Sequence, residues 1–161
     1  MTHTKVAIVM GSDSDWRVMK KAKEILDQFE IPSVCKVLSA HRTPEDLPPF
    51  IKTSEDSGVK VFIAGAGAAA HLPGMFAAYT LMPVIGVPMN STSLNGLDSL
   101  LSIVQMPEGI PVATVGVDNA GNAALLAIRI LAAHDTNLSK RLITFREEMA
   151  KKSRLKSENL K

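Results

Sequence analysis

The segment VCKVLSAHRTPED, residues 34–46, joins an apolar run, a polar loop and the start of a charged helix. The run Val34 to Leu38 is apolar throughout most of its length, which predicts a buried β-strand. Thr43 is a suitable N-cap, and Pro44 suits the first turn of a helix, where acidic residues are also favoured. A hydroxyl, an imidazole and a guanidinium therefore lie together at a strand exit. Such a set is suited to holding a phosphate and moving a proton.

The same order of strand, polar loop and helix recurs along the chain. Apolar runs without alternation predict strands buried on both faces, which is typical of parallel sheets. Each run is followed by a helical segment, so we expect an α/β fold: a three-layer, doubly wound parallel sheet, flavodoxin-like or Rossmann-like, with right-handed crossovers. The other strands are expected at Val6–Met10, Val59–Ala64, Pro83–Val87 and Pro111–Val117, and the other helices at Trp16–Phe29, Leu72–Leu81, 95–105 and Gly121–His134.

Two segments depart from this regular pattern. Pro48 and Pro49 should distort or shorten the helix that begins near Thr43, because proline removes a backbone donor. At the end of the chain, four apolar residues spaced by three or four positions predict an extra amphipathic helix over about 137–155. We expect a single domain, 1–161, with its core in about 5–134. The stripe consists of Leu138, Leu142, Phe145 and Met149.

Charge is distributed unevenly along the sequence. Between Ser57 and His134 only five residues are charged, although several helices are expected there. Helices on the faces of a monomeric sheet normally carry a charged outer side, whereas loss of charge with retention of Met, Ala and Leu is typical of a subunit interface. We therefore expect a homo-oligomer. The alternative is that the N- and C-terminal segments cover these helices.

Composition limits the classes of partner and location. The formal net charge of +2 provides no broad electrostatic basis for binding nucleic acid. The first apolar run is too short for a signal peptide or a membrane span, so no membrane partner and a cytoplasmic location are expected. Cys35 lies within an apolar strand and is expected to be a buried structural thiol.

Polar or glycine residues follow each of the first four predicted strands. In a parallel sheet the carboxyl ends of the strands share one edge, where ligands bind, so these residues predict one site. From the sequence alone, Asp15 is either an acceptor for sugar hydroxyls or a helix cap, and His71 is either a ligand contact or a cap. The residues concerned are Ser12 and Asp15; Ser39, His41 and Arg42; Gly65, Gly67 and His71; and Asn90 with Ser91, Thr92 and Ser93.

Two cofactor classes are disfavoured. The pattern Gly65-x-Gly67-x-x-Ala70 is similar to a dinucleotide-binding fingerprint, but it follows the third strand rather than the first. No acidic residue occurs from Ser57 through Leu97, so the usual partner of the ribose hydroxyl is missing. The glycines are more consistent with close approach of a small ligand to backbone N–H groups. No metal site is expected either, because the histidines show no ligand spacing with Cys35 or a carboxylate.

Long ordered motifs covering most of residues 5–134 resemble the PurE family. Arg42 and the string His71–Gly74 resemble its class I, the N5-carboxyaminoimidazole ribonucleotide mutases, whereas class II typically has lysine at the position of Arg42. The motifs are GSDSDW at 11–16, SAHRTP at 39–44, AGAAAHLPG ending at 74, PVIGVP at 83–88 and GLDSLLSIVQMP at 96–107.

The resemblance implies an isomerase of purine biosynthesis that moves a carboxylate from N5 to C4 of an imidazole ribonucleotide. It implies no metal or organic cofactor, and a homo-octamer. The roles that carry over are phosphate contacts for Ser12, Ser39 and Arg42, a ribose contact for Asp15, the lining of the base and carboxylate pocket for Gly67 and His71, and proton transfer for His41.

One segment and one single position depart from the family pattern. The segment 115–122 is slightly shorter than expected for the family, and Ala68 stands where many relatives have glycine, which we expect to be a minor steric change.

Two other functions remain open. One alternative is class II chemistry, in which aminoimidazole ribonucleotide is carboxylated with CO2. The other is a non-enzymatic module that binds a nucleotide or a flavin phosphate and leaves His41 without a role.

Overall fold

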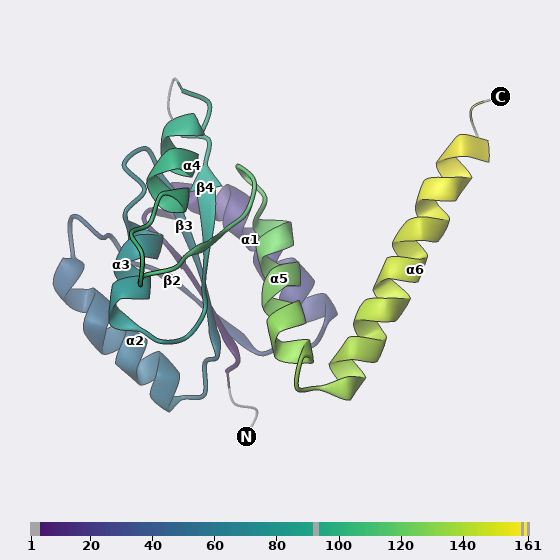
Figure 1. Cartoon of the computed structure of the whole chain (residues 1–161), viewed down its shortest axis with the longest axis horizontal. Helices are drawn as coiled ribbons and strands as arrows, with labels where there is room; N and C mark the ends of the chain where they lie inside the picture. The colour runs from purple at the N-terminus through teal and green to yellow at the C-terminus, as the bar shows by residue number, and fades with distance from the viewer. Residues whose placement is uncertain (1–3, 92–93, 159, 161) are drawn as a thin grey trace. The chain divides into compact units, whose positions relative to one another are not determined.

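The computed structural model describes residues 4–91, 94–158 and 160 of the chain. These residues form two compact units, one ending at Ala127 and one beginning at Ile128, and each is described by itself. The first unit contains the sheet and the helices that pack on it, as Figure 1 shows. Thr92, Ser93 and His3 lie outside the described residues, so the polar residues expected after the fourth strand are only partly described.

The first unit is built on a parallel sheet of five strands in the order β2-β1-β3-β4-β5. This confirms the doubly wound α/β fold expected from the apolar runs. The chain moves from β1 outward to β2, and then returns to the other side of β1 to form β3, β4 and β5 in order. The strands are β1 (Val6–Met10), β2 (Ser33–Val37), β3 (Val61–Gly67), β4 (Val84–Met89) and β5 (Ala113–Thr114).

Helices of the first unit lie on both sides of the sheet (Figure 1), and the helices of both units occur close to their expected places in the sequence. A 3₁₀ turn at Pro44–Asp46 precedes α2, so Pro48 and Pro49 fall in the first turn of the α-helix, where N–H groups have no intrahelical partner. The expected distortion is therefore confined to the start of the helix. The helices are α1 (Trp16–Gln28), α2 (Leu47–Asp56), α3 (Leu72–Tyr79), α4 (Leu97–Val104), α5 (Ala120–Ala132) and α6 (Thr136–Glu158).

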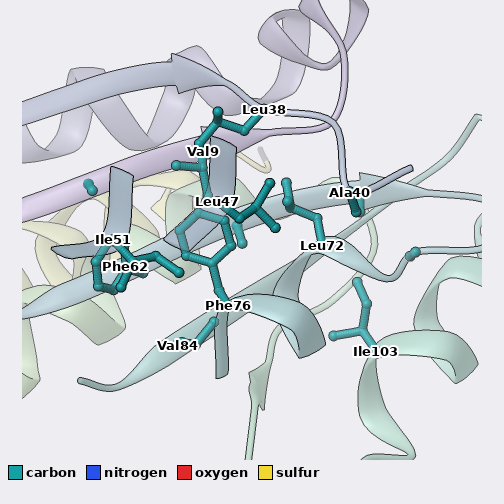
Figure 2. Packing of buried hydrophobic residues seen from close by; sticks show 14 of the residues in the cluster. Val9, Leu38, Ala40, Leu47, Ile51, Phe62, Leu72, Phe76, Val84 and Ile103 are labelled. Carbon is teal, nitrogen blue, oxygen red and sulfur yellow. The ribbon is translucent and has the colours of Figure 1, made fainter. Parts of the chain in front are cut away.

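One face of the sheet packs against α2, α3 and α4 (Figure 2). Phe62 of β3 and Phe76 of α3 are fully buried, with ring centroids 5.3 Å apart. Val9, Leu47 and Ile103 complete this layer from β1, α2 and α4. On the other face, Met19 of α1 lies against the backbone of β3 at Gly65, and Gly121 at the start of α5 approaches Ile25 of α1. On this second face, the glycines thus allow neighbouring side chains to approach the backbone closely.

The expectation of a buried second strand is wrong. β2 is an edge strand, and Val34 and Val37 expose 36% and 47% of their surface. Cys35 is partly exposed rather than buried, and partial burial raises the pKa of its thiol. The apolar run was a poor guide because an edge strand pairs on one side only, and its burial depends on the strand order.

Two other strands differ from their expected lengths. β3 continues through Gly67, so the glycines expected at its exit lie within the strand. β5 contains only two residues, Ala113 and Thr114, although a strand was expected from Pro111 to Val117. The sheet therefore has a long central strand that extends toward the ligand edge and a minimal strand at its far side.

The second unit consists of the end of α5 and the whole of α6. α6 extends slightly beyond the expected range of 137–155. Leu138 is buried, whereas Met149, a member of the same apolar stripe, exposes 51% of its surface. Within the described residues, no helix is both long and apolar enough to cross a membrane. The expectation of a single domain stays a prediction.

Candidate active site

A pocket of about 430 Å³ lies at the carboxyl ends of β1, β2 and β3. The strand order reverses here, because β2 and β3 lie on opposite sides of β1, and such a switch point is the usual ligand site of an open α/β sheet. Every residue to which the family resemblance assigns a role contributes to the wall of this one pocket. Those residues are Ser12, Asp15, Ser39, His41, Arg42, Gly67 and His71.

The loop after β1 is held by a capping box. The Ser12 N–H donates to the Asp15 carboxylate at 3.3 Å, and the Ser14 N–H donates to the Ser12 hydroxyl at 3.4 Å. Burial raises the pKa of Asp15, and the hydrogen bond from Ser12 opposes this shift. The two interpretations of Asp15 are therefore compatible, because its carboxylate caps the turn and also lines the pocket.

Arg42 links the exits of the first two strands. Its Nη2 donates to the carbonyl of Gly11 at 2.9 Å, and its Nε donates to the Ser39 hydroxyl at 3.1 Å. The Arg42 backbone N–H also donates to that hydroxyl, at 3.2 Å. The guanidinium is thus pre-oriented at the pocket while the side chain remains exposed, a suitable arrangement for an anionic ligand group.

His41 and His71 form a direct pair across the pocket. His41 Nε2 lies 2.7 Å from His71 Nδ1, and the rings meet edge to face with centroids 4.9 Å apart. One of these nitrogens must carry a proton and the other must accept it, so at least one ring is neutral in this arrangement. The pair therefore contains both a proton donor and a proton acceptor.

The alternative role of His71 as a helix cap is wrong for its side chain. His71 precedes α3, but its ring makes no capping hydrogen bond to the helix. The ring bonds to His41 instead. His41, 30 positions earlier in the sequence, thus holds the His71 side chain by a hydrogen bond. The local sequence pattern did not predict this contact.

The glycines of β3 serve packing rather than a phosphate-binding turn. A Cβ at Gly65 would collide with the side chains of Met89 and Met19, and a Cβ at Gly67 would collide with the hydroxyl of Ser91. Both glycines lie within the strand, whereas a dinucleotide fingerprint places them in the following turn. Gly65 therefore admits the two methionines, and Gly67 admits Ser91, which follows β4.

Ala68 has a positive φ of 53° directly after β3. This left-handed conformation disfavours a side chain, and for an L-residue it costs about 1–2 kcal/mol. The expectation of a minor steric change missed this point, because backbone conformation rather than space decides the effect. Ala68 lines the pocket, so the strained residue is part of the site.

Sequence reasoning missed several contacts. Gly11 and Ser14 also line the pocket. Asp118 accepts a hydrogen bond from the Asn90 N–H at 2.9 Å, and Arg17 donates to the Asn90 carbonyl at 3.0 Å. The isolation of Asp118 in a charge-poor segment was a usable signal. Within the described part of the chain, no group of three or more His, Cys, Asp or Glu residues could hold a metal ion.

Residues 5–152 match the model of the AIR carboxylase family. The chain belongs to this family. This confirms the resemblance drawn from the motifs at the strand exits. The match spans the whole sheet and most of α6, so the pocket described above lies entirely within the AIR carboxylase region.

Relatives and solved structures agree with this membership. A protein of Pyrococcus abyssi named N5-carboxyaminoimidazole ribonucleotide mutase is 60% identical over 90% of this chain and 83% of its own. A protein of Bacillus subtilis with the same name is 57% identical over 88% of this chain and 89% of its own. The crystal structure of Treponema denticola PurE has a TM-score of 0.88 at 32% identity, over 97% of this chain and 98% of its own.

The close approach of Ser91 to Gly67 generates a prediction. Gly67→Ala should displace Ser91, because its hydroxyl and its Cβ both lie too close to the added methyl. Overpacking of this kind typically costs about 1–3 kcal/mol of stability. Gly11→Ala is the matched control, since its Cβ would meet only Asp15, at 3.9 Å. Crystal structures and denaturant unfolding of both variants measure the effect. An unmoved Ser91 in Gly67→Ala would contradict the prediction.

Proposed function

We propose that this protein is an N5-carboxyaminoimidazole ribonucleotide mutase of purine biosynthesis, an isomerase that moves a carboxylate from N5 to C4 of its substrate. The observation that carries the proposal is the His41–His71 pair, which lies in one pocket with the oriented Arg42. The pocket thus contains both a cation that can anchor a phosphate and a pair of rings that can exchange protons. Curated relatives such as those of Pyrococcus abyssi and Bacillus subtilis bear this name.

The proposed binding mode follows from the exposed donors and acceptors. Ser39 and Arg42 contact the 5′-phosphate together with Ser12, because a guanidinium and neutral hydroxyls provide complementary donors. Asp15, whose carboxylate faces the pocket from the capping box, accepts from the ribose hydroxyls. This orientation directs the imidazole ring toward His41, with the backbone at Gly67 and the ring of His71 around it.

The proposed reaction uses His41 first as an acid and then as a base. His41 gives a proton to N5 as the N5–carboxylate bond breaks, which releases CO2 and leaves an electron-rich ring. C4 attacks the CO2, and His41 removes the proton from C4 to restore the aromatic ring. Imidazole suits both steps because its ordinary pKa lies near neutral pH. The carboxylate leaves and returns within one substrate, so the sequence of steps requires no added oxidant, reductant or carboxyl donor.

The wall formed after β3 holds CO2 between the two steps. Ala66 and Leu72 are buried and apolar, and they line the pocket beside His71. Keeping CO2 next to C4 makes a bimolecular step effectively unimolecular. In well-oriented systems this effect lowers the activation barrier by up to about 7–11 kcal/mol. Ala66, Ala68 and Ala69 are small, so this wall leaves room for a linear molecule such as CO2.

The decisive assay compares two substrates. Turnover of N5-carboxyaminoimidazole ribonucleotide to the C4 isomer without added bicarbonate supports the proposal. Activity only with aminoimidazole ribonucleotide and added bicarbonate would instead show the class II carboxylase. A yellow flavin spectrum in the purified protein, with neither activity, would favour the binding module. Arg42 and the names of the curated relatives favour the mutase.

We further propose that the enzyme is a cytoplasmic homo-octamer. Leu97, Leu101 and Val104 lie on α4 and expose 53%, 45% and 50% of their surface. Such an apolar face in a charge-poor segment is suited to burial by another subunit. We propose the cytoplasmic location because the substrate carries a charged phosphate, which keeps it in the compartment where it is made. Light scattering of the purified protein is expected to give eight times the chain mass of 17.3 kDa. A monomeric mass would contradict the assembly.

His41→Asn is expected to lower kcat by about a hundredfold or more, because general acid–base groups contribute factors of this size. Substrate binding should remain, since the anchoring contacts of Arg42 and Ser39 do not involve the imidazole. Single-turnover kinetics and equilibrium binding measure the two effects. His134→Asn, which lies outside the pocket lining, is the matched control. Near wild-type turnover in His41→Asn would remove His41 from the chemistry.

Arg42→Ala is expected to raise the KM for the ribonucleotide about tenfold or more, with a smaller effect on kcat, because charge-assisted hydrogen bonds to phosphate are lost. Steady-state kinetics measures the change. Lys52→Ala provides the control, since it removes one positive charge from an exposed position on α2, away from the pocket. An unchanged KM in Arg42→Ala would contradict the phosphate role.

A further inference from the structure

The peptide backbone of Asn90 is held on both sides by charged side chains from distant elements. Arg17 Nη2, from α1, donates to the Asn90 carbonyl at 3.0 Å. The Asn90 N–H, in turn, donates to Asp118 Oδ1, from the loop between β5 and α5, at 2.9 Å. These partners lie 73 and 28 positions away along the chain. Two charges are thus directed at the backbone of one exposed residue.

Asp118 is itself rigidly placed. Its backbone N–H donates to the carbonyl of Pro88 in β4 at 2.9 Å, and its φ is +55°. The preceding residue, Val117, packs so closely on Gly96 that a Cβ at Gly96 would lie 2.5 Å from it. The backbone of Asp118 is therefore attached to the end of β4 independently of the hydrogen bond between its carboxylate and Asn90.

Asn90 immediately precedes Ser91, which lines the pocket. Ser91 lies against Gly67 so tightly that no Cβ fits between them. The position of the Asn90 backbone thus determines how closely Ser91, after β4, approaches Gly67 at the end of β3. Burial raises the pKa of Asp15 across the pocket, and the charges of Arg17 and Asp118 act on the same carboxyl in opposite directions. Both charged residues therefore lie near the proposed ribose contact.

A separate hydrogen bond already holds the end of β4 one residue earlier, at Met89. The buried Ser99 hydroxyl of α4 donates to the carbonyl of Met89 at 2.8 Å, which joins the end of β4 to α4. The contacts of Arg17 and Asp118 lie beyond this point, at the residue that leads into the pocket wall. These two contacts therefore position the pocket wall more directly than they stabilise the sheet.

We propose that Arg17 and Asp118 are positioning residues, which hold the backbone of Asn90 so that Ser91 forms the strand-four wall of the ribonucleotide pocket. The inference rests on the proposed mutase function for its substrate. Neither residue is among those that line the pocket, so each acts through Asn90 and Ser91. The residue types follow from this task, because a carboxylate accepts from an N–H group and a guanidinium donates to a carbonyl.

Kinetics of Asp118 variants test the assignment. Asp118→Ala should raise the KM for N5-carboxyaminoimidazole ribonucleotide about five- to tenfold, with kcat within about twofold, because one hydrogen bond that holds the pocket wall is lost. Asp118→Asn retains an oxygen that can accept from the Asn90 N–H, so its KM should stay within about twofold of wild type. Glu108→Ala, which removes another isolated acid of the same charge-poor segment, is the control.

Arg17→Ala should raise KM in the same direction. Because both side chains act on one residue, the double variant Arg17→Ala/Asp118→Ala should show less than the product of the two separate effects. A KM unchanged in Asp118→Ala would overturn the proposal. Equal losses in Asp118→Ala and Asp118→Asn would also overturn it, because charge and not the hydrogen bond would then be responsible.

Amide hydrogen exchange without substrate separates this proposal from the proposed function. The Asn90 amide should exchange at least about tenfold faster in Asp118→Ala, while amides of β1 and β3 keep their protection. An unchanged rate at Asn90 would overturn the contact as a restraint. Wild-type protein that lacks mutase turnover would overturn the proposed function, and the exchange result would still decide whether Asp118 holds this backbone.

Discussion

The parallel pairing of β1 with both β2 and β3 underlies every other feature of the site. Val6–Met10 is fully buried and aligned with Ser33–Val37 on one side and Val61–Gly65 on the other. Because the strands are parallel and in register, their carboxyl ends reach the same edge, and the loops that follow them surround one pocket. The strand order reverses at β1, which leaves the space that crossover helices would otherwise cover. The polar groups converge there because of this backbone pairing.

The polar groups reinforce one another once the sheet has gathered them. Arg42 joins the loop after β2 to the backbone after β1, and His41 joins the same loop to His71 beside β3. The proposed division between anchoring and proton transfer therefore arises within four residues, 39–42, whose partners come from different strand exits. A substrate that contacts both Arg42 and the histidine pair would be oriented by side chains that hydrogen bonds already hold in place, which limits the ordering cost of binding.

The AIR carboxylase membership, the strand positions and most of the polar pocket residues were predictable from the sequence, because apolar runs and strand-exit motifs are local signals. The errors have a common cause. The edge position of β2, the partial exposure of Cys35 and the capture of His71 by His41 all depend on which elements become neighbours. The strained φ of Ala68 and the link from Asp118 to Asn90 are equally non-local, since each depends on how loops from different strands fit together.

The sequence by itself determined the alternation of strands and helices, the polar character of each strand exit and the chemical groups available for catalysis. These properties follow from residue type and spacing, which act over a few positions. Only the tertiary structure decided that His41 and His71 share a hydrogen bond, that Arg42 reaches Gly11, and that Arg17 and Asp118 meet at Asn90. Such contacts need side-chain atoms from distant segments to come within about 3 Å. That proximity is set by the order and register of the strands, which no local pattern encodes.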